Sequence, residues 1–181
     1  TNPADSKNLI ELGTRSLLVE DGKKLILIDC GLGNKQDEKF FGHYSLYGDE
    51  SLDKNLKKFG FVREDITDVF LTHLHFDHCG GAIEWNDDKT GYRPAFKNAQ
   101  FWTNENHWQW ATEPNPREKA SFLKENILPM QESGQLQFLP TPKTGNYGFA
   151  PDLKMDVIFV DGHTEKQMLP VIQYQEKTIV F

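Results

Sequence analysis

The chain has 181 residues, a formal net charge of −7 and 38% hydrophobic residues. This length and apolar content suffice for a real core, so we expect residues 1–181 to form a single domain. The acidic balance argues against a nucleic-acid partner, because neutralising a phosphate backbone requires a basic surface.

The sequence also gives no sign of a membrane partner. No apolar run reaches the roughly 18 residues needed to span a bilayer, and the start "TNPADSKNLIEL" lacks the basic and apolar regions of a signal peptide. Cys30 and Cys79 are the only cysteines, which is too few for a disulfide framework. We expect a soluble, cytoplasmic protein with free thiols, and the sequence leaves its oligomeric state open.

The first predicted elements are a hairpin and a helix. "SLLVE" and "KLILID", between Ser16 and Asp29, are typical of two strands joined by an Asp-Gly turn. "SLDKNLKKFG" places Leu52, Leu56 and Phe59 on one helical face, and Gly60 is expected to end the helix. We expect this helix to lie on the sheet that the hairpin begins.

A buried strand should follow in "DITDVFLT". Its apolar run, Val69 to Thr72, leads directly into a cluster of histidines at the carboxyl end of the strand. Ligand sites in open α/β folds favour that position. Gly80 and Gly81 behind the cluster should allow a sharp turn of the backbone.

The second half alternates predicted helices and strands. After a turn at 87–91, "AQFWT" predicts a strand, and Asn104 is a possible N-cap for a helix in "ENHWQWA". Pro116 and the spacing of apolar residues predict a helix from 116 to about 127. "LQFL", "MDVIFV", "MLPVIQY" and "TIVF" predict further strands, and the whole indicates an α/β fold.

The stretch "THLHFDHCGG" contains the residues that we expect to bind metal ions. Neutral imidazole is a common zinc ligand, and His73 and His75 at a strand end can point to one side and share an ion. Asp77 and His78 lie just beyond and can face a second ion. Such a pattern should arise by chance in roughly one comparable chain in two thousand. We interpret Cys79 as a small buried packing residue.

These residues resemble the H-x-H-x-D-H signature of the metallo-β-lactamase superfamily. "LILIDCG" upstream is similar to that family's strand ending in Asp-x-Gly, and "VDGHTEKQM" is similar to its Gly-His-Thr segment. The resemblance implies an αββα sandwich and two divalent metal ions, zinc by preference, although manganese, iron or cobalt would fit. The residues it implies are His73, His75 and His163 for the first metal, Asp77 and His78 for the second, and Asp29 behind the ligands as a hydrogen-bond acceptor.

The chain departs from this family at its ends. In the family, "TIVF" would be followed by an aspartate that bridges both metals and later by a last histidine ligand, but no Asp follows Asp161 and no His follows His163. The start also differs, because the family usually has one or two strands before the hairpin that "SLLVE" begins. We therefore expect an incomplete copy of a domain nearer about 250 residues long, which as written could be inactive.

The implied activity is hydrolysis of a small-molecule substrate. Two adjacent cations lower the pKa of a shared water and polarise a carbonyl, and the resemblance implies that Asp77 positions the resulting hydroxide. "THLHFDHCGG" followed by residues 95–111 and 114–136 looks most like the lactonases, arylesterases and organophosphate hydrolases. A β-lactamase, a glutathione-thioester hydrolase and a non-catalytic metal-binding or interaction module remain open.

The remaining histidines and aromatic segments have a simpler interpretation. His43 and His107 lack ligand spacing, so we expect packing or surface roles. "FFGHYSLY" and "FWTNENHWQW" could wall an apolar substrate pocket, but aromatic clusters more often belong to a core.

Overall fold

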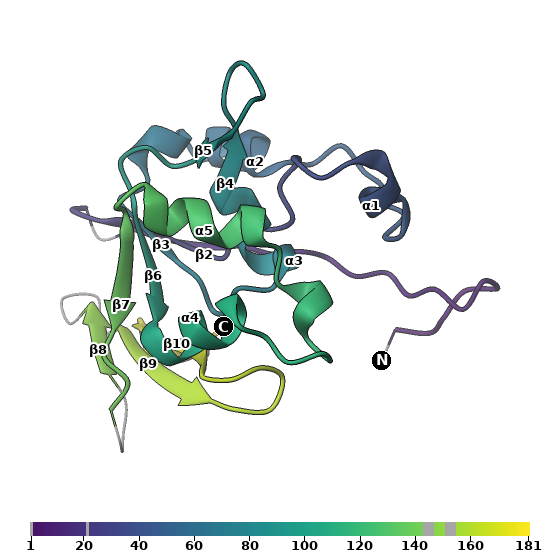
Figure 1. Ribbon diagram of the computed structural model, residues 1–181. Helices are drawn as coiled ribbons and strands as arrows, with labels where there is room; N and C mark the ends of the chain where they lie inside the picture. Colours follow the sequence, from purple (N-terminus) through teal and green to yellow (C-terminus); the bar gives the residue numbers. More distant parts are fainter. Residues whose placement is uncertain (1, 21, 143–146, 151–154) are drawn as a thin grey trace.

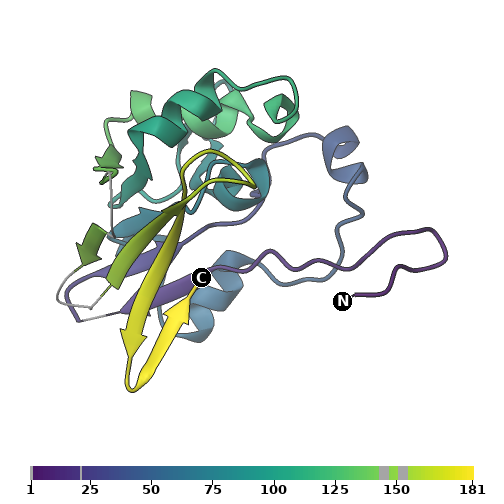
Figure 2. The same cartoon turned by 90° about the horizontal axis from the view of Figure 1, so that it is seen from below.

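The computed structural model describes residues 2–20, 22–142, 147–150 and 155–181. Two β-sheets lie face to face, and helices cover the outer face of the first sheet (Figures 1 and 2). Figure 2 shows the green-to-yellow strands of the second sheet crossing in front of the purple strands of the first. This layering confirms the predicted α/β class.

The first sheet has the strand order β1-β2-β3-β6-β7. Its strands are β1 (Leu17–Glu20), β2 (Leu25–Ile28), β3 (Asp68–Phe70), β6 (Gln100–Asn104) and β7 (Leu136–Leu139). The hairpin strands β1 and β2 are antiparallel, whereas β2, β3, β6 and β7 run parallel to one another. The carboxyl ends of the parallel strands therefore meet at one edge.

The second sheet is antiparallel, with the order β11-β10-β9-β8. Its strands are β8 (Tyr147–Ala150), β9 (Met155–Val160), β10 (Gln167–Tyr174) and β11 (Lys177–Val180). A separate hairpin joins β4 (Ile83–Trp85) to β5 (Tyr92–Pro94). The α-helices are α1 (Glu38–Gly42), α2 (Leu52–Lys58), α3 (Phe76–Cys79), α4 (Glu105–Thr112) and α5 (Lys124–Glu132).

Most predicted elements are confirmed, but two predictions were wrong. The helix expected from Pro116 to about 127 begins only at Lys124, because the side chain and carbonyl of Asn115 bind the backbone N–H groups of Glu118 and Lys119 and close a turn there. Phe59 is 76% exposed rather than on the buried face of α2, since the helix ends at Lys58. The helix α1 and the strands β4, β5 and β8 were not predicted.

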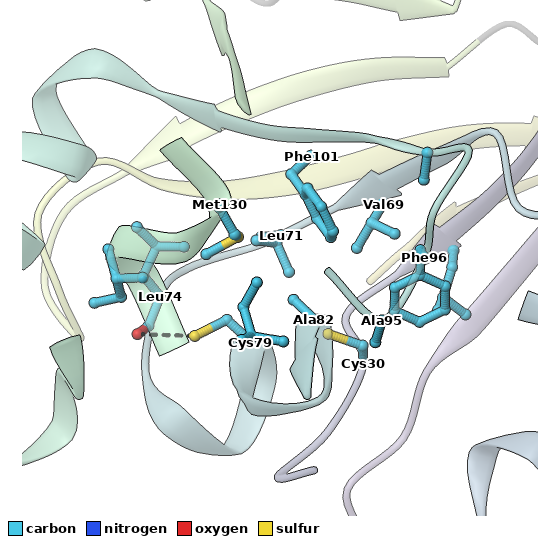
Figure 3. Packing of buried hydrophobic residues seen from close by; sticks show 14 of the residues in the cluster. Cys30, Val69, Leu71, Leu74, Cys79, Ala82, Ala95, Phe96, Phe101 and Met130 are labelled. Atoms are coloured by element: carbon cyan, nitrogen blue, oxygen red, sulfur yellow. Dashed lines mark hydrogen bonds between the residues drawn. The ribbon is translucent and has the colours of Figure 1, made fainter. Parts of the chain in front are cut away.

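Two apolar clusters hold the layers together. One lies between the first sheet and the helices, and Figure 3 shows its centre, where Leu71, Phe101 and Met130 meet. In the cluster between the sheets, every buried member comes from a strand. Strand β2 contributes Leu25 and Leu27 to the first cluster and the alternate residues to the second, as the period of a strand requires. Each such buried side chain stabilises the fold by about 1.5–3 kcal/mol.

The glycine pair behind the histidine cluster is required by close backbone contact rather than by an unusual backbone angle. Gly80 has an ordinary helical φ of −57°, and a Cβ at Gly81 would overlap the carbonyl oxygen of Cys30. The buried Nζ of Lys35 donates hydrogen bonds to the carbonyl oxygens of Gly80 and Ile83. The turn that follows α3 is thus fixed by the backbone segment at Cys30 to Gly33 and by one buried ammonium group.

In the part of the chain that the structure describes, none of the helices has the length and apolar character needed to cross a bilayer.

We expect Gly81→Ala to lower the free energy of unfolding by about 3 kcal/mol, because the new methyl group would displace the backbone at Cys30. Gly42→Ala is the matched control: a Cβ added at Gly42 would meet no atom within 4 Å, and the φ of Gly42 is not positive. Urea denaturation of both variants checks the difference, and equal midpoints would contradict the packing argument.

Candidate metal centre

Three histidines from two loops meet at the carboxyl edge of the first sheet. His73 and His75 follow strand β3, and His163 lies in the loop between β9 and β10. Each offers a ring nitrogen, and these three atoms all lie within 4.8 Å of one another. The ring centroids of His73 and His75 are 4.6 Å apart, and each lies 5.0 Å or less from the ring of His163. The structure therefore brings together the three residues proposed for the first metal.

The chemistry of this group fits a cation. The Nε2 atoms of His73 and His75 are buried and have no hydrogen-bond partner among the residues that the structure describes. A buried polar atom without a partner costs about 1–3 kcal/mol, so two at one point call for an explanation. Burial, followed by the neighbouring histidines, lowers the pKa of both rings, which keeps the imidazoles neutral and their lone pairs available.

A hydrogen-bond network behind His73 determines which of its nitrogens faces the site. Asp29 accepts hydrogen bonds from the backbone N–H of Thr72 (2.8 Å) and from its hydroxyl group (2.8 Å). The same hydroxyl oxygen lies 3.0 Å from Nδ1 of His73. Because the single hydroxyl proton goes to the carboxylate, Nδ1 of His73 must carry the proton in that contact. Nε2 is then the unprotonated atom, as ligation requires.

Asp29 reaches the other half of the motif as well. Nδ1 of His78 lies 2.7 Å from Oδ2 of Asp29, so this ring also directs Nε2 away from the carboxylate. Burial acts to lower the pKa of His78, but the hydrogen bond and the charge of Asp29 outweigh burial and raise it. Asp29 itself, 1% exposed, has a positive φ of 55°. Its carboxylate lies behind the candidate ligands His73 and His78.

Asp77 and His78 occupy the more open side of the site. Both belong to the short helix α3, and His78 Nε2 lies 3.5 Å from Oδ2 of Asp77. Their side chains are 43% and 34% exposed. Within the described residues, the only cluster of three suitably placed ligand atoms is that of His73, His75 and His163. A second cation at Asp77 and His78 stays a prediction.

One carboxylate near the site was missed by the sequence analysis. Oε2 of Glu118 lies 3.7 Å from Nε2 of His75 and accepts hydrogen bonds from the hydroxyl of Thr164 and the indole N–H of Trp110. Burial acts to raise the pKa of Glu118, but those donors and His75 lower it overall. No spacing in the sequence signals this contact, because Glu118 lies in an irregular segment between α4 and α5.

The aromatic segments have separate positions. Phe40, Tyr44 and Phe76 form a ring cluster with centroid separations of 5.1–5.2 Å, and Phe76 lies between His75 and Asp77 in the chain. Trp102 and Trp108 pack instead in the two apolar clusters. The first aromatic segment therefore packs against Phe76, which stands between two candidate ligands in the chain, whereas the second contributes mainly to the core.

The two cysteines lie in the core. Figure 3 shows Cys30 and Cys79 among apolar side chains, with Cys79 Sγ donating to the carbonyl of Leu74. Burial raises the pKa of both thiols, to about 12 for Cys79. A protonated thiol is a poor metal ligand, which agrees with the packing role expected for Cys79.

Comparison with known proteins places the chain in a family. Residues 9–181 match the family described as the metallo-beta-lactamase superfamily. An N-acyl homoserine lactonase from Bacillus cereus is 22% identical over 183 residues, which is 96% of this chain and 63% of the lactonase.

Solved structures show a similar fold. A probable metal-dependent hydrolase from Staphylococcus aureus superposes with a TM-score of 0.85 at 24% identity, over 99% of this chain and 60% of that one. AidC, a dizinc quorum-quenching lactonase, superposes with a TM-score of 0.63 at 24% identity, over 91% of this chain and 54% of that one. The chain thus spans less than two thirds of the length of each of these relatives. Since the family match covers nearly the whole sequence, the chain belongs to the metallo-beta-lactamase superfamily.

Proposed function

We propose that the protein is a metal-dependent hydrolase of a lactone or ester. The observation that carries this proposal is the buried Nε2 of His73 and of His75, which have no hydrogen-bond partner among the described residues, in side chains whose ring nitrogens converge with one of His163. Three imidazole side chains whose ring nitrogens meet at one point are the donor set of a catalytic zinc site that keeps one position open.

The proposed ligands divide into two groups. His73, His75 and His163 would hold the first cation, and Asp77 and His78 would contribute to a second. Zinc suits imidazole ligands best, and manganese, iron or cobalt are alternatives according to supply. When bound, two such cations would supply Lewis acidity and make a nearby water more acidic. We assign the orientation of that water to the half-exposed carboxylate of Asp77.

The substrate class is proposed from the site's surroundings and from its relatives. Phe40, Tyr44 and Phe76 form an apolar ring cluster, and Phe76 stands between His75 and Asp77 in the chain, so we assign this cluster to an acyl or aryl group of the substrate. Lactonase structures related to this chain hold N-hexanoyl-L-homoserine, an acylated product. We therefore place a lactone or ester with an apolar substituent first, and a phosphotriester second.

The test is hydrolysis by the full-length protein loaded with zinc. Acid release should be fastest with a long-chain lactone or an aryl ester, compared with a phosphotriester, a β-lactam and a glutathione thioester. His73→Ala should abolish both zinc retention and turnover, since it removes a central ligand.

Each other outcome has a definite meaning. If the β-lactam or the thioester is hydrolysed fastest, the proposed substrate class is wrong, but the proposal of a metal-dependent hydrolase stands. Zinc binding without turnover of any substrate would favour a non-catalytic metal-binding module, and wild-type turnover by His73→Ala would contradict the metal mechanism.

We expect Thr72→Val to weaken zinc binding at least tenfold, because the substitution removes the hydroxyl group that joins Asp29 to Nδ1 of His73. Chelator competition measures the change in the dissociation constant. Thr103→Val is the matched control: its hydroxyl is also buried but has no hydrogen-bond partner among the described residues. Thr103→Val should leave zinc affinity unchanged, and equal losses in the two variants would contradict the role given to Thr72.

A further inference from the structure

His107, on the first turn of helix α4, makes two hydrogen bonds to backbone groups of the ligand-bearing loops. Its Nε2 accepts from the backbone N–H of Leu74, at 2.9 Å. Its Nδ1 lies 2.6 Å from the carbonyl oxygen of Glu165. Leu74 stands between the candidate ligands His73 and His75, and Glu165 stands two residues after His163. One buried ring, 1% exposed, therefore connects the two loops that converge on the site.

The partners of His107 fix its protonation state without ambiguity. A backbone N–H can only donate, so Nε2 must be unprotonated, and a carbonyl oxygen can only accept, so Nδ1 must carry the proton. The ring is neutral in this arrangement. Burial lowers its pKa to about 4, which agrees with a neutral ring under ordinary conditions. Both nitrogens are used within the protein, which leaves neither for a metal.

Two other side chains, those of Asn104 and Glu118, also bind the loop that follows His163. The amide of Asn104 donates to the carbonyl of Lys166 (2.8 Å) and accepts from the backbone N–H of His107 (2.9 Å). The carboxylate of Glu118 accepts from the hydroxyl of Thr164 (2.7 Å). Three consecutive residues, 164–166, are thus each held by a different side chain from the segment 104–118. This concentration of contacts lies directly after His163, whose own side chain is exposed.

We infer that His107 is a positioning residue of the metal centre, which holds the loop of His73 and His75 at a fixed separation from the loop of His163. This inference rests on the proposed metal-dependent function. His163 comes from the second sheet, whereas the other two ligands come from the first, so their spacing depends on contacts that cross between the loops. Met168 N–H, bound to the carbonyl of Thr72 at 2.8 Å, provides another such contact. Unlike that contact, the hydrogen bond of His107 reaches the backbone of Leu74, which lies between the candidate ligands His73 and His75.

The experiment compares metal binding by variants of the full-length protein. His107→Leu fills the buried space but makes neither hydrogen bond, so we expect Zn²⁺ affinity to fall at least tenfold in chelator competition. The visible absorption spectrum of the Co²⁺-loaded variant should change, because the spacing of the ligands alters. His107→Gln, whose amide oxygen and nitrogen can replace the acceptor and donor, should restore most of the affinity and the wild-type spectrum.

Asp68→Asn is the control for general loss of stability. Asp68 is buried at the opposite end of strand β3, where it accepts from the indole of Trp102 (2.8 Å) and pairs with Lys24 (3.1 Å). This variant should lower the melting temperature without changing metal affinity or the Co²⁺ spectrum. If His107→Leu does not fold, His107→Asn takes its place, because the shorter amide cannot span both backbone groups.

The outcomes separate the two proposals. If the wild-type protein binds no metal, the proposed function fails. The inference is overturned if the wild-type protein binds metal and His107→Leu, or His107→Asn in its place, keeps metal affinity within twofold and an unchanged Co²⁺ spectrum. It is overturned equally if Asp68→Asn weakens metal binding as much, because the effect would then follow from stability alone.

Discussion

The carboxylate of Asp29 connects the end of strand β2 to both halves of the ligand motif. It accepts hydrogen bonds from the backbone and hydroxyl of Thr72 and lies 2.7 Å from Nδ1 of His78. Adjacent parallel strands bring these groups to one edge, because β2 and β3 pair in register. A φ of 55° at a non-glycine residue costs conformational energy, and three hydrogen bonds to one buried carboxylate offset it. Other features of the site are arranged around this contact.

Backbone packing fixes the site independently of any ligand. The segment from Cys30 to Leu32 lies against Gly80 and Gly81 so closely that no side chain fits between them. The carbonyl groups of that turn are bound by the buried ammonium of Lys35. These backbone and ammonium contacts therefore fix the end of the helix that carries Asp77 and His78, and none of them involves a cation at the candidate site. A preformed arrangement of this kind lets a cation bind without first ordering the loops.

Local patterns predicted most of the fold and the candidate ligands, because strand alternation, an N-capping Asn104 and a dense histidine motif are all short-range signals. They failed where distant contacts decide the structure. Ala120, Leu123 and Ile127 have helical spacing, yet this segment forms only a short 3-10 helix at Lys119–Ser121 before α5 begins at Lys124. The turn closed by Asn115 and the contact of Glu118 with Thr164 hold it in that conformation. His107 is buried, which agrees with the packing or surface role expected from its lack of ligand spacing, but its hydrogen bonds go to backbone groups of Leu74 and Glu165, which carry no sequence signature.

The five histidines at this edge differ in their use of the two ring nitrogens. His73 and His78 each direct Nδ1 toward the Asp29 network, and His107 uses both nitrogens on backbone groups. His73 and His75 are left with a buried Nε2 that has no hydrogen-bond partner among the described residues. Such atoms destabilise the folded chain, so the two apolar clusters must offset their cost. A cation bound there would remove that cost, and under the proposed function metal affinity and fold stability would be coupled through the same two nitrogen atoms.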